Sequence, residues 1–136
     1  MASGRFSRMW RVYGVVVLAA AGLAGCDGKA AVPQEMAAAV ERGENYFHDY
    51  CAPCHRPEYG AFAPNLHGVL GRDAGSTDFS YSPAFKAQDF TWDEDSLRAF
   101  LQYPRQVVPD NRMAFFGFED ERMREDIVAF FKYKMK

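Results

Sequence analysis

The most informative stretch of the sequence is Cys51-Ala52-Pro53-Cys54-His55. Its pattern, C-x-x-C-H, is the attachment signal of a c-type haem. Two thiols three positions apart can each form a thioether with one of the two vinyl groups of a single porphyrin. His55 follows directly, where its imidazole can reach the iron from one face. The stretch therefore predicts one haem c, attached covalently through Cys51 and Cys54, with His55 as an iron ligand.

Two other uses of a C-x-x-C pair fit this sequence less well. A thioredoxin-like redox pair is embedded in alternating strands and helices, and no segment here alternates with a period of two. A structural zinc site needs four ligands, whereas the chain has neither a second C-x-x-C nor an H-x₃₋₅-H. Haem attachment is therefore the preferred interpretation of the motif.

The composition is that of one folded domain. The chain has 136 residues, of which 49% are hydrophobic and 25% are charged, a balance typical of a single globular unit. Its 12 Phe, 7 Tyr and 2 Trp are many for this length and suit a core built around a flat group. A formal net charge of −2 argues against nucleic acid as a partner, because nucleic-acid binders present a basic face. The usual phosphate-binding glycine motifs are absent as well.

Hydrophobic periodicity predicts three helices. The first covers residues 34–50. The second opens with a capping box at Thr91-x-x-Glu94 and stops before Pro104. The third runs from about Asp120 to the C-terminus, with acids at its start and lysines at its end, which suits the helix dipole.

The remaining segments are predicted to be long loops. Residues 51–80 and 104–118 are rich in Gly and Pro and show little periodicity. Loops of this length inside a compact domain need something other than backbone hydrogen bonds to organise them. An all-α domain with its loops wrapped around a haem meets that need.

The N-terminus predicts an exported lipoprotein. Three arginines precede an uncharged apolar stretch at residues 12–25, whose 14 residues are too few to span a bilayer, which takes about 20. This is typical of a secretory signal peptide. Leu23-Ala24-Gly25-Cys26 resembles the lipobox of bacterial lipoproteins, in which the Cys is acylated and becomes the mature N-terminus. An ordinary signal peptidase site with Cys26 incidental, and an uncleaved anchor, are the alternatives.

The predicted organisation is a lipoprotein signal peptide at 1–25, a lipid-anchored tether at 26–36 and a globular domain at 37–136. Lipidation would account for the odd third Cys of the chain, since the other two form one motif. Removing residues 1–25 takes away three Arg and no acid, which leaves 13 basic and 18 acidic residues and a net charge of −5. The mature chain is therefore acidic.

Further motifs extend along the whole predicted domain. They are Glu41-Arg42-Gly43-x-x-x-Phe47, Pro64-Asn65-Leu66-His67-Gly68, Gly71-Arg72, Phe79-Ser80-Tyr81-Ser82, Thr91-Trp92, Tyr103-Pro104, Val108-Pro109, Met113-Ala114-Phe115, Glu125-Asp126 and the final amphipathic helix. Together with C-A-P-C-H they make residues 41–136 similar to the class I, mitochondrial-type monohaem cytochromes c. The resemblance implies that the N- and C-terminal helices cross, with long loops wrapped around one covalently attached haem. It also implies that Gly43 lets Phe47, Ile127 and Phe130 interlock.

The resemblance implies Met113 as the sixth iron ligand, opposite His55. Met113 lies in the loop between the last two expected helices. A Met ligand raises the reduction potential and completes the coordination of the iron. His48, on the first expected helix, and His67, which the family has as a structural loop residue, are the alternatives.

The resemblance also implies four residues around the haem. The carbonyl of Pro64 accepts the ring N–H of His55, which fixes the tautomer of the imidazole and raises its basicity. Arg72, Tyr81 and Trp92 are similar to the family's donors to the haem propionates, whose charge is costly to bury unpaired. A surface arginine and two core aromatic residues are the simpler interpretation of these three positions.

Three positions near the expected haem depart from the family pattern. Phe100 stands where the family often has a Tyr whose hydroxyl reaches the Met sulfur, so that hydrogen bond is expected to be missing. Phe85 replaces a polar residue, and Ala63 stands where Gly is usual. These changes leave the expected iron ligands in place.

A haem with both axial positions taken by protein has no open site for oxygen or peroxide, so the expected role is one-electron transfer and not catalysis. The chain is expected to be lipid-anchored to the periplasmic face of a bacterial cytoplasmic membrane. Its electron donor would be a quinol-oxidising cytochrome complex or a dehydrogenase, and its acceptor a terminal oxidase or reductase. The alternatives are a fixed haem c subunit of a larger oxidoreductase and a peroxidase-like haem enzyme, which needs Met113 to dissociate easily.

Docking to these complexes is expected to depend little on charge. The mature chain has only five Lys, whereas mitochondrial-type relatives often present a lysine-rich face around the haem edge. Arg105 and Arg112 flank the Met113 loop and leave a small basic patch there. We expect apolar contact around Phe115 and Phe116, together with the tether, to replace much of the electrostatic steering.

Overall fold

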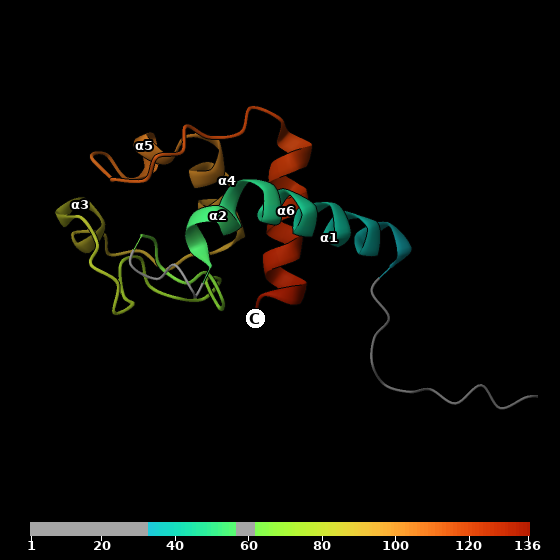
Figure 1. The fold of residues 1–136 in the computed structure, drawn as a ribbon, viewed down its shortest axis with the longest axis horizontal. Coiled ribbons are helices and arrows are strands. Elements are labelled where there is room, and N and C mark those ends of the chain that lie inside the picture. Colours follow the sequence, from blue (N-terminus) through green and yellow to red (C-terminus); the bar gives the residue numbers. More distant parts are fainter. Residues whose placement is uncertain (1–32, 57–61) are drawn as a thin grey trace, which may run out of the picture. The chain divides into compact units, whose positions relative to one another are not determined.

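A computed structural model describes residues 33–56 and 62–136, which belong to the unit Ala31–Lys136. The predicted signal peptide, Cys26 and most of the predicted tether lie outside the described residues. The helical elements are α1 (Gln34–Tyr46), η1 (Phe47–Cys51), α2 (Ala52–His55), α3 (Pro83–Lys86), α4 (Glu94–Gln102), α5 (Pro104–Val107) and α6 (Glu121–Lys134) (Figure 1).

The described part of the chain is helical, as predicted, and contains no strand beyond one isolated bridge between Asp73 and Thr91. Within those residues no helix is both long enough and apolar enough to cross a membrane. Residues 62–82 and 108–120 are irregular, in agreement with the loop prediction.

The first helix begins at Gln34, as predicted, and differs from the prediction at its C-terminal end. It includes residues 34–36, which were also assigned to the tether, and the helical conformation does not stop before the Cys motif. A π-helical turn, η1, carries the chain through Cys51, and α2 continues to His55. The prediction of a loop from Cys51 was therefore wrong for residues 51–55. A π-turn takes one residue more than an α-turn, and such turns are frequent at functional sites.

The cap of α4 also differs from the prediction. Asp93, and not Thr91, is the N-cap: its Oδ1 accepts the backbone N–H of Ser96 at 2.7 Å, and the Ser96 hydroxyl accepts the N–H of Asp93 at 2.9 Å. Thr91 is engaged elsewhere, because its hydroxyl donates to Asp73 at 2.6 Å. The helix ends at Gln102, before Pro104, as predicted. A short helix, α5, then interrupts the predicted loop.

Helices α1 and α6 cross (Figure 1), and Gly43 of α1 lies against Asp126 and Phe130 of α6. A Cβ atom at Gly43 would overlap the carbonyl oxygen of Asp126 and lie 2.9 Å from the Cβ of Phe130. Next to the crossing, the ring of Phe47 packs at 5.3 Å from that of Phe130, and Ile127 is completely buried. The predicted interlocking is present, and the close approach of the two backbones offsets the helix-propensity cost of glycine, which is about 1 kcal/mol.

A charged pair ties the same two helices together. Nε and Nη2 of Arg42 donate to the two carboxylate oxygens of Asp126 at 2.7 and 2.8 Å. Asp126 is only 2% exposed, whereas the Arg42 side chain is 36% exposed. The hydrogen bonds to Asp126 raise the pKa of the Arg42 guanidinium. The sequence alone did not single out this pair, because it joins residues 84 positions apart.

Arg42→Ala is expected to lower the free energy of unfolding of the haem-loaded protein more than the loss of a surface ion pair does, because it leaves the buried Asp126 carboxylate without its partner. Denaturant titration followed by circular dichroism measures this loss. The matched control is Arg98→Ala, which removes ion pairs to carboxylates that are all at least 39% exposed, and which should cost less than about 1 kcal/mol. Equal losses in the two variants would contradict the assignment.

Candidate cofactor site

A cavity of about 370 Å³ lies beneath the Cys motif, within the range typical of small-molecule and cofactor sites. Cys51, Cys54 and His55 line it from η1 and α2, and Met113 lines it from the loop between α5 and α6. Most of the remaining lining is apolar or aromatic, namely Leu66, Val69, Phe79, Phe85, Trp92, Leu97, Phe100, Leu101, Phe115 and Phe131. Such walls suit a flat, largely apolar group.

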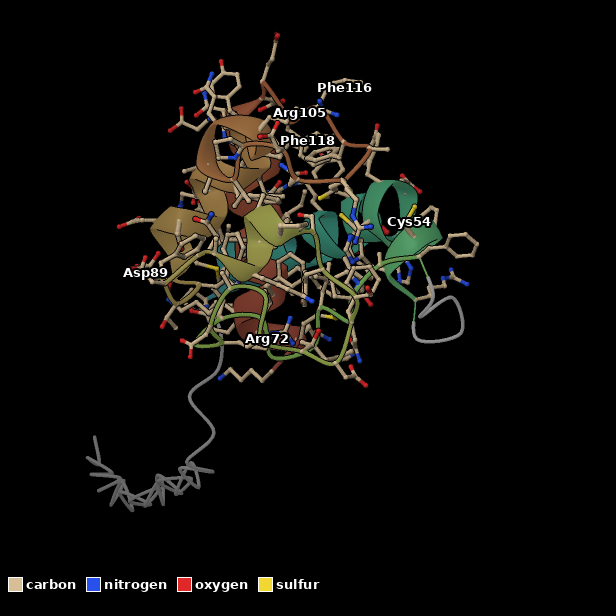
Figure 2. All side chains as sticks on the ribbon, turned by 90° about the vertical axis from the view of Figure 1, so that its left-hand side faces the viewer. Cys54, Arg72, Asp89, Arg105, Phe116 and Phe118 are labelled. Atoms are coloured by element: carbon tan, nitrogen blue, oxygen red, sulfur yellow. The ribbon has the colours of Figure 1, made fainter. Side chains whose placement is uncertain are left out.

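The two thiols differ in their surroundings. Cys51 is buried, and this burial raises the pKa of its thiol to about 12. Cys54 is exposed at the mouth of the cavity, where Figure 2 shows it at the edge of the molecule. Both side chains line the same cavity. The donor set and the shape of the cavity therefore fit a haem attached through two thioethers.

His55 is prepared for metal binding by its backbone partner. Its Nδ1 lies 2.8 Å from the carbonyl oxygen of Pro64, so the Nδ1–H donates and the lone pair of Nε2 stays free. Burial lowers the pKa of the imidazole, and the hydrogen bond to Pro64 offsets part of that effect. A neutral imidazole with its other nitrogen hydrogen-bonded to a carbonyl is the usual form of a metal-bound histidine.

Met113 is the candidate sixth ligand that the structure brings to the cavity. Its side chain is half-buried and lines the cavity together with His55. The two alternatives lie elsewhere: His48 and His67 are exposed and are not among the residues that line this cavity. The structure therefore favours Met113 over both histidines.

Arg72, Tyr81 and Trp92, the expected propionate donors, all line the cavity. Arg72 donates from Nη1 and Nη2 to the carbonyl oxygens of His67 and Asn65, each at 2.9 Å, and so holds the loop that follows Pro64. The Tyr81 hydroxyl is hydrogen-bonded to that of Thr77 at 2.9 Å. These contacts position the side chains, and their role toward a haem stays a prediction.

The apolar wall includes the positions that depart from the family pattern. Trp92 is buried, with its ring 5.1 Å from that of Phe100 and 4.8 Å from that of Phe90. Phe85 lies 5.8 Å from Phe100, and both rings line the cavity. Phe100 places no hydroxyl in the cavity that also holds Met113.

Sequence analysis missed Asn111 as a residue of the site and placed Arg112 only in a basic patch beside the Met113 loop. Arg112 lines the cavity and donates from Nη2 to the carbonyl oxygen of Ser80, which joins the Met113 loop to residues 79–82. Asn111 is buried two positions before Met113. An Asn in a turn that contains Pro and Asp indicates a hydrogen bond from its side chain to the backbone two residues further on. The sequence does not indicate that this Asn is buried.

No protein-family model matches the chain. The cytochrome c of Stellaria longipes is 37% identical over 101 residues, which cover 71% of this chain and 94% of that relative. The cytochrome c of Tetrahymena pyriformis is 40% identical over 91 residues, which cover 66% of this chain and 84% of that relative. Among solved structures, cytochrome cH from Methylobacterium extorquens matches with a TM-score of 0.65 and 35% identity, over 70% of this chain and 98% of its own.

Proposed function

The chain belongs to the class I monohaem cytochromes c, electron-transfer proteins with one covalently attached haem c, and we propose that it is a carrier tethered to the periplasmic face of a bacterial cytoplasmic membrane. The predicted family, fold class, cofactor and electron-transfer role are confirmed by these relatives. The iron ligands, the tether and the identity of the partners belong to the proposal.

The observation that carries the proposal is the cavity shared by His55 and Met113. When bound, the haem iron supplies a one-electron couple between Fe(II) and Fe(III). The Pro64 carbonyl fixes the tautomer of His55, so that the lone pair of Nε2 would be free to bind the iron. The thioether of Met113 would be the second protein ligand of the iron and would exclude water and peroxide. The largely apolar lining disfavours the more highly charged oxidised state, and with the Met ligand it raises the reduction potential.

The tether is proposed from the N-terminal sequence. Since α1 begins at Gln34, the seven residues 27–33 separate an acylated Cys26 from the folded domain. Fully extended, they span at most about 23 Å. A tether this short would keep the carrier close to membrane-bound oxidoreductases and so raise the rate of productive encounters.

Cys26→Ser is expected to remove palmitate from the full-length protein and to release it into the periplasm or block its processing. The measurement is labelling with radioactive palmitate in a bacterium that processes lipoproteins, followed by separation of membrane and soluble fractions. Cys54→Ser is the matched control, because it removes an exposed thiol of the C-x-x-C-H motif and should leave the label in place. Absence of label from the wild-type protein would refute the anchor and leave the haem site untouched.

The docking surface is proposed to be the apolar edge formed by Phe115 and Phe116. Phe116 is 85% exposed and points away from the molecule (Figure 2). Phe115 is half-buried and lies 4.7 Å from Phe118, ring centre to ring centre, which holds it at the rim of the haem cavity. We propose that this edge contacts a quinol-oxidising complex or dehydrogenase during reduction, and a terminal oxidase or reductase during oxidation.

Oxidation of the reduced protein by membranes of the producing bacterium is expected to depend weakly on salt. The second-order rate should fall by less than about threefold as the screening length shrinks from ~30 Å at 0.01 M to ~10 Å at 0.1 M salt. Phe116→Ala should slow the reaction more than Arg105→Ala does, because it removes apolar contact. A steep fall with salt that Arg105→Ala abolishes would show that charge dominates docking.

A further inference from the structure

Asn111 is a buried amide beside the candidate ligand Met113. It is only 4% exposed, although it lies in the irregular segment between α5 and α6. A buried side-chain amide is costly unless its donors and acceptor find partners. Every polar atom of this side chain has one.

The side chain of Asn111 makes three hydrogen bonds to the backbone. Its Oδ1 accepts the N–H of Met113 at 3.0 Å. Its Nδ2 donates to the carbonyl oxygen of Val108 at 2.7 Å and to that of Pro104 at 3.1 Å. One amide therefore connects the backbone of Met113 to the first residue of α5 and to the residue that follows this helix.

The two carbonyl partners of Asn111 belong to the best-buried part of the protein. Pro104 and Val108 are among the large side chains that are less than 2% exposed. Between Val108 and Asn111 the chain makes a tight turn, closed by a backbone hydrogen bond of 3.3 Å, in which Asp110 has a φ of 59°. Asn111 thus fixes the loop at the point where it leaves the core.

The far end of the loop is fixed independently. The N–H of Phe118 donates to the carbonyl of Leu101 at 2.8 Å, and a Cβ at Gly117 would overlap the carbonyl of Gln102. Residues 112–116 therefore lie between two anchors, and Asn111 is the anchor nearer to Met113.

We propose that Asn111 is a positioning residue that holds Met113 on the iron, a role that rests on the proposed His55 and Met113 ligation. Its amide transmits the rigidity of α5 to the backbone of Met113, so that the thioether stays in place in both oxidation states. Loss of the three hydrogen bonds frees the N-terminal half of the loop, and the sulfur leaves the iron more often.

Cyanide binding to the oxidised, haem-loaded protein measures this opening, because cyanide enters only when the sixth position is free. Asn111→Ala should accelerate cyanide binding at least tenfold in stopped-flow experiments and weaken the Met-to-iron charge-transfer band. Asn111→Ser replaces the amide by a hydroxyl that can still accept the N–H of Met113, although Ser makes such turn hydrogen bonds more weakly than Asn does. This variant should therefore give an intermediate acceleration of cyanide binding. Tenfold corresponds to about 1.4 kcal/mol, which is modest for three buried hydrogen bonds.

Arg42→Ala is the matched control, since it destabilises the fold at the crossing of α1 and α6 without touching the loop. It should leave the cyanide rate within about twofold of wild type at temperatures where both proteins are folded. Acceleration in both Asn111 variants, but not in Arg42→Ala, supports the proposal. The proposal is overturned if cyanide binds to Asn111→Ala no faster than to the control. If Asn111→Ala does not fold, the same comparison is made with Asn111→Ser. If Met113→Ala leaves the wild-type spectrum unchanged, the ligation itself is wrong and the positioning role falls with it.

Discussion

Gly43→Ala is expected to destabilise the haem-loaded protein by about 3 kcal/mol or more, a large loss for a single added methyl group. In an isolated helix the same change would stabilise by up to about 1 kcal/mol, because alanine is the better helix former. In this protein the substitution is expected to destabilise instead, because the new Cβ would overlap the backbone carbonyl of Asp126, which cannot move aside by changing a rotamer. Helices α1 and α6 must then separate and open the contact between Phe47 and Phe130.

Thermal and denaturant unfolding of the variant, with absorbance of the bound haem as a second probe, measure the effect. Gly68→Ala is the control, because Gly68 has a φ of 65° and no atom within 4 Å of the added Cβ. The Gly68→Ala variant therefore tests backbone strain alone, and its free energy of unfolding should fall by about 1 kcal/mol. A stability of Gly43→Ala equal to or above that of wild type would show that the two helices do not approach as closely as the structure places them.

Met113→Ala is expected to convert the carrier into a protein with an open sixth position. Alanine has no atom that can reach the iron, so external ligands should bind without waiting for the loop to open. Cyanide binding to the oxidised form should accelerate by about a hundredfold or more, which corresponds to about 2.8 kcal/mol. The reduction potential should fall at the same time, because the thioether favours Fe(II).

Replacements at the two histidine alternatives are the controls for this result. His48→Ala and His67→Ala alter exposed side chains outside the cavity and should leave both the cyanide rate and the potential near the wild-type values. If cyanide binding were accelerated in His67→Ala and unchanged in Met113→Ala, the sixth ligand would be His67 and not Met113.

Much of the site could be predicted because its chemistry is local in sequence. Cys51, Cys54 and His55 are members of one short motif, and their spacing alone specifies the cofactor. The crossing of the terminal helices could be predicted through the resemblance, which assigned Gly43 to the point of contact. The structure and the relatives confirm the helical fold and the haem c class.

The features that could not be predicted depend on contacts between residues far apart in the sequence, which no local sequence pattern indicates. The helix continues through residues 51–55 by way of a π-turn, whereas the Gly and Pro content and the weak periodicity predicted a loop there. Asp93 displaced Thr91 as the cap because Thr91 bonds to Asp73, 18 positions away. The Arg42–Asp126 pair and the hydrogen bonds of Asn111 likewise depend on which backbone segments the tertiary fold brings together.

The most direct test of the His55 and Met113 ligation is the visible spectrum of the oxidised protein. The proposed structure predicts a weak charge-transfer band at the near-infrared edge, arising from the bond between the Met sulfur and the iron. This band should be present in the wild type and in His67→Ala and absent from Met113→Ala. A wild-type spectrum without the band, or a band that survives in Met113→Ala, would contradict the assignment of Met113 as the sixth ligand.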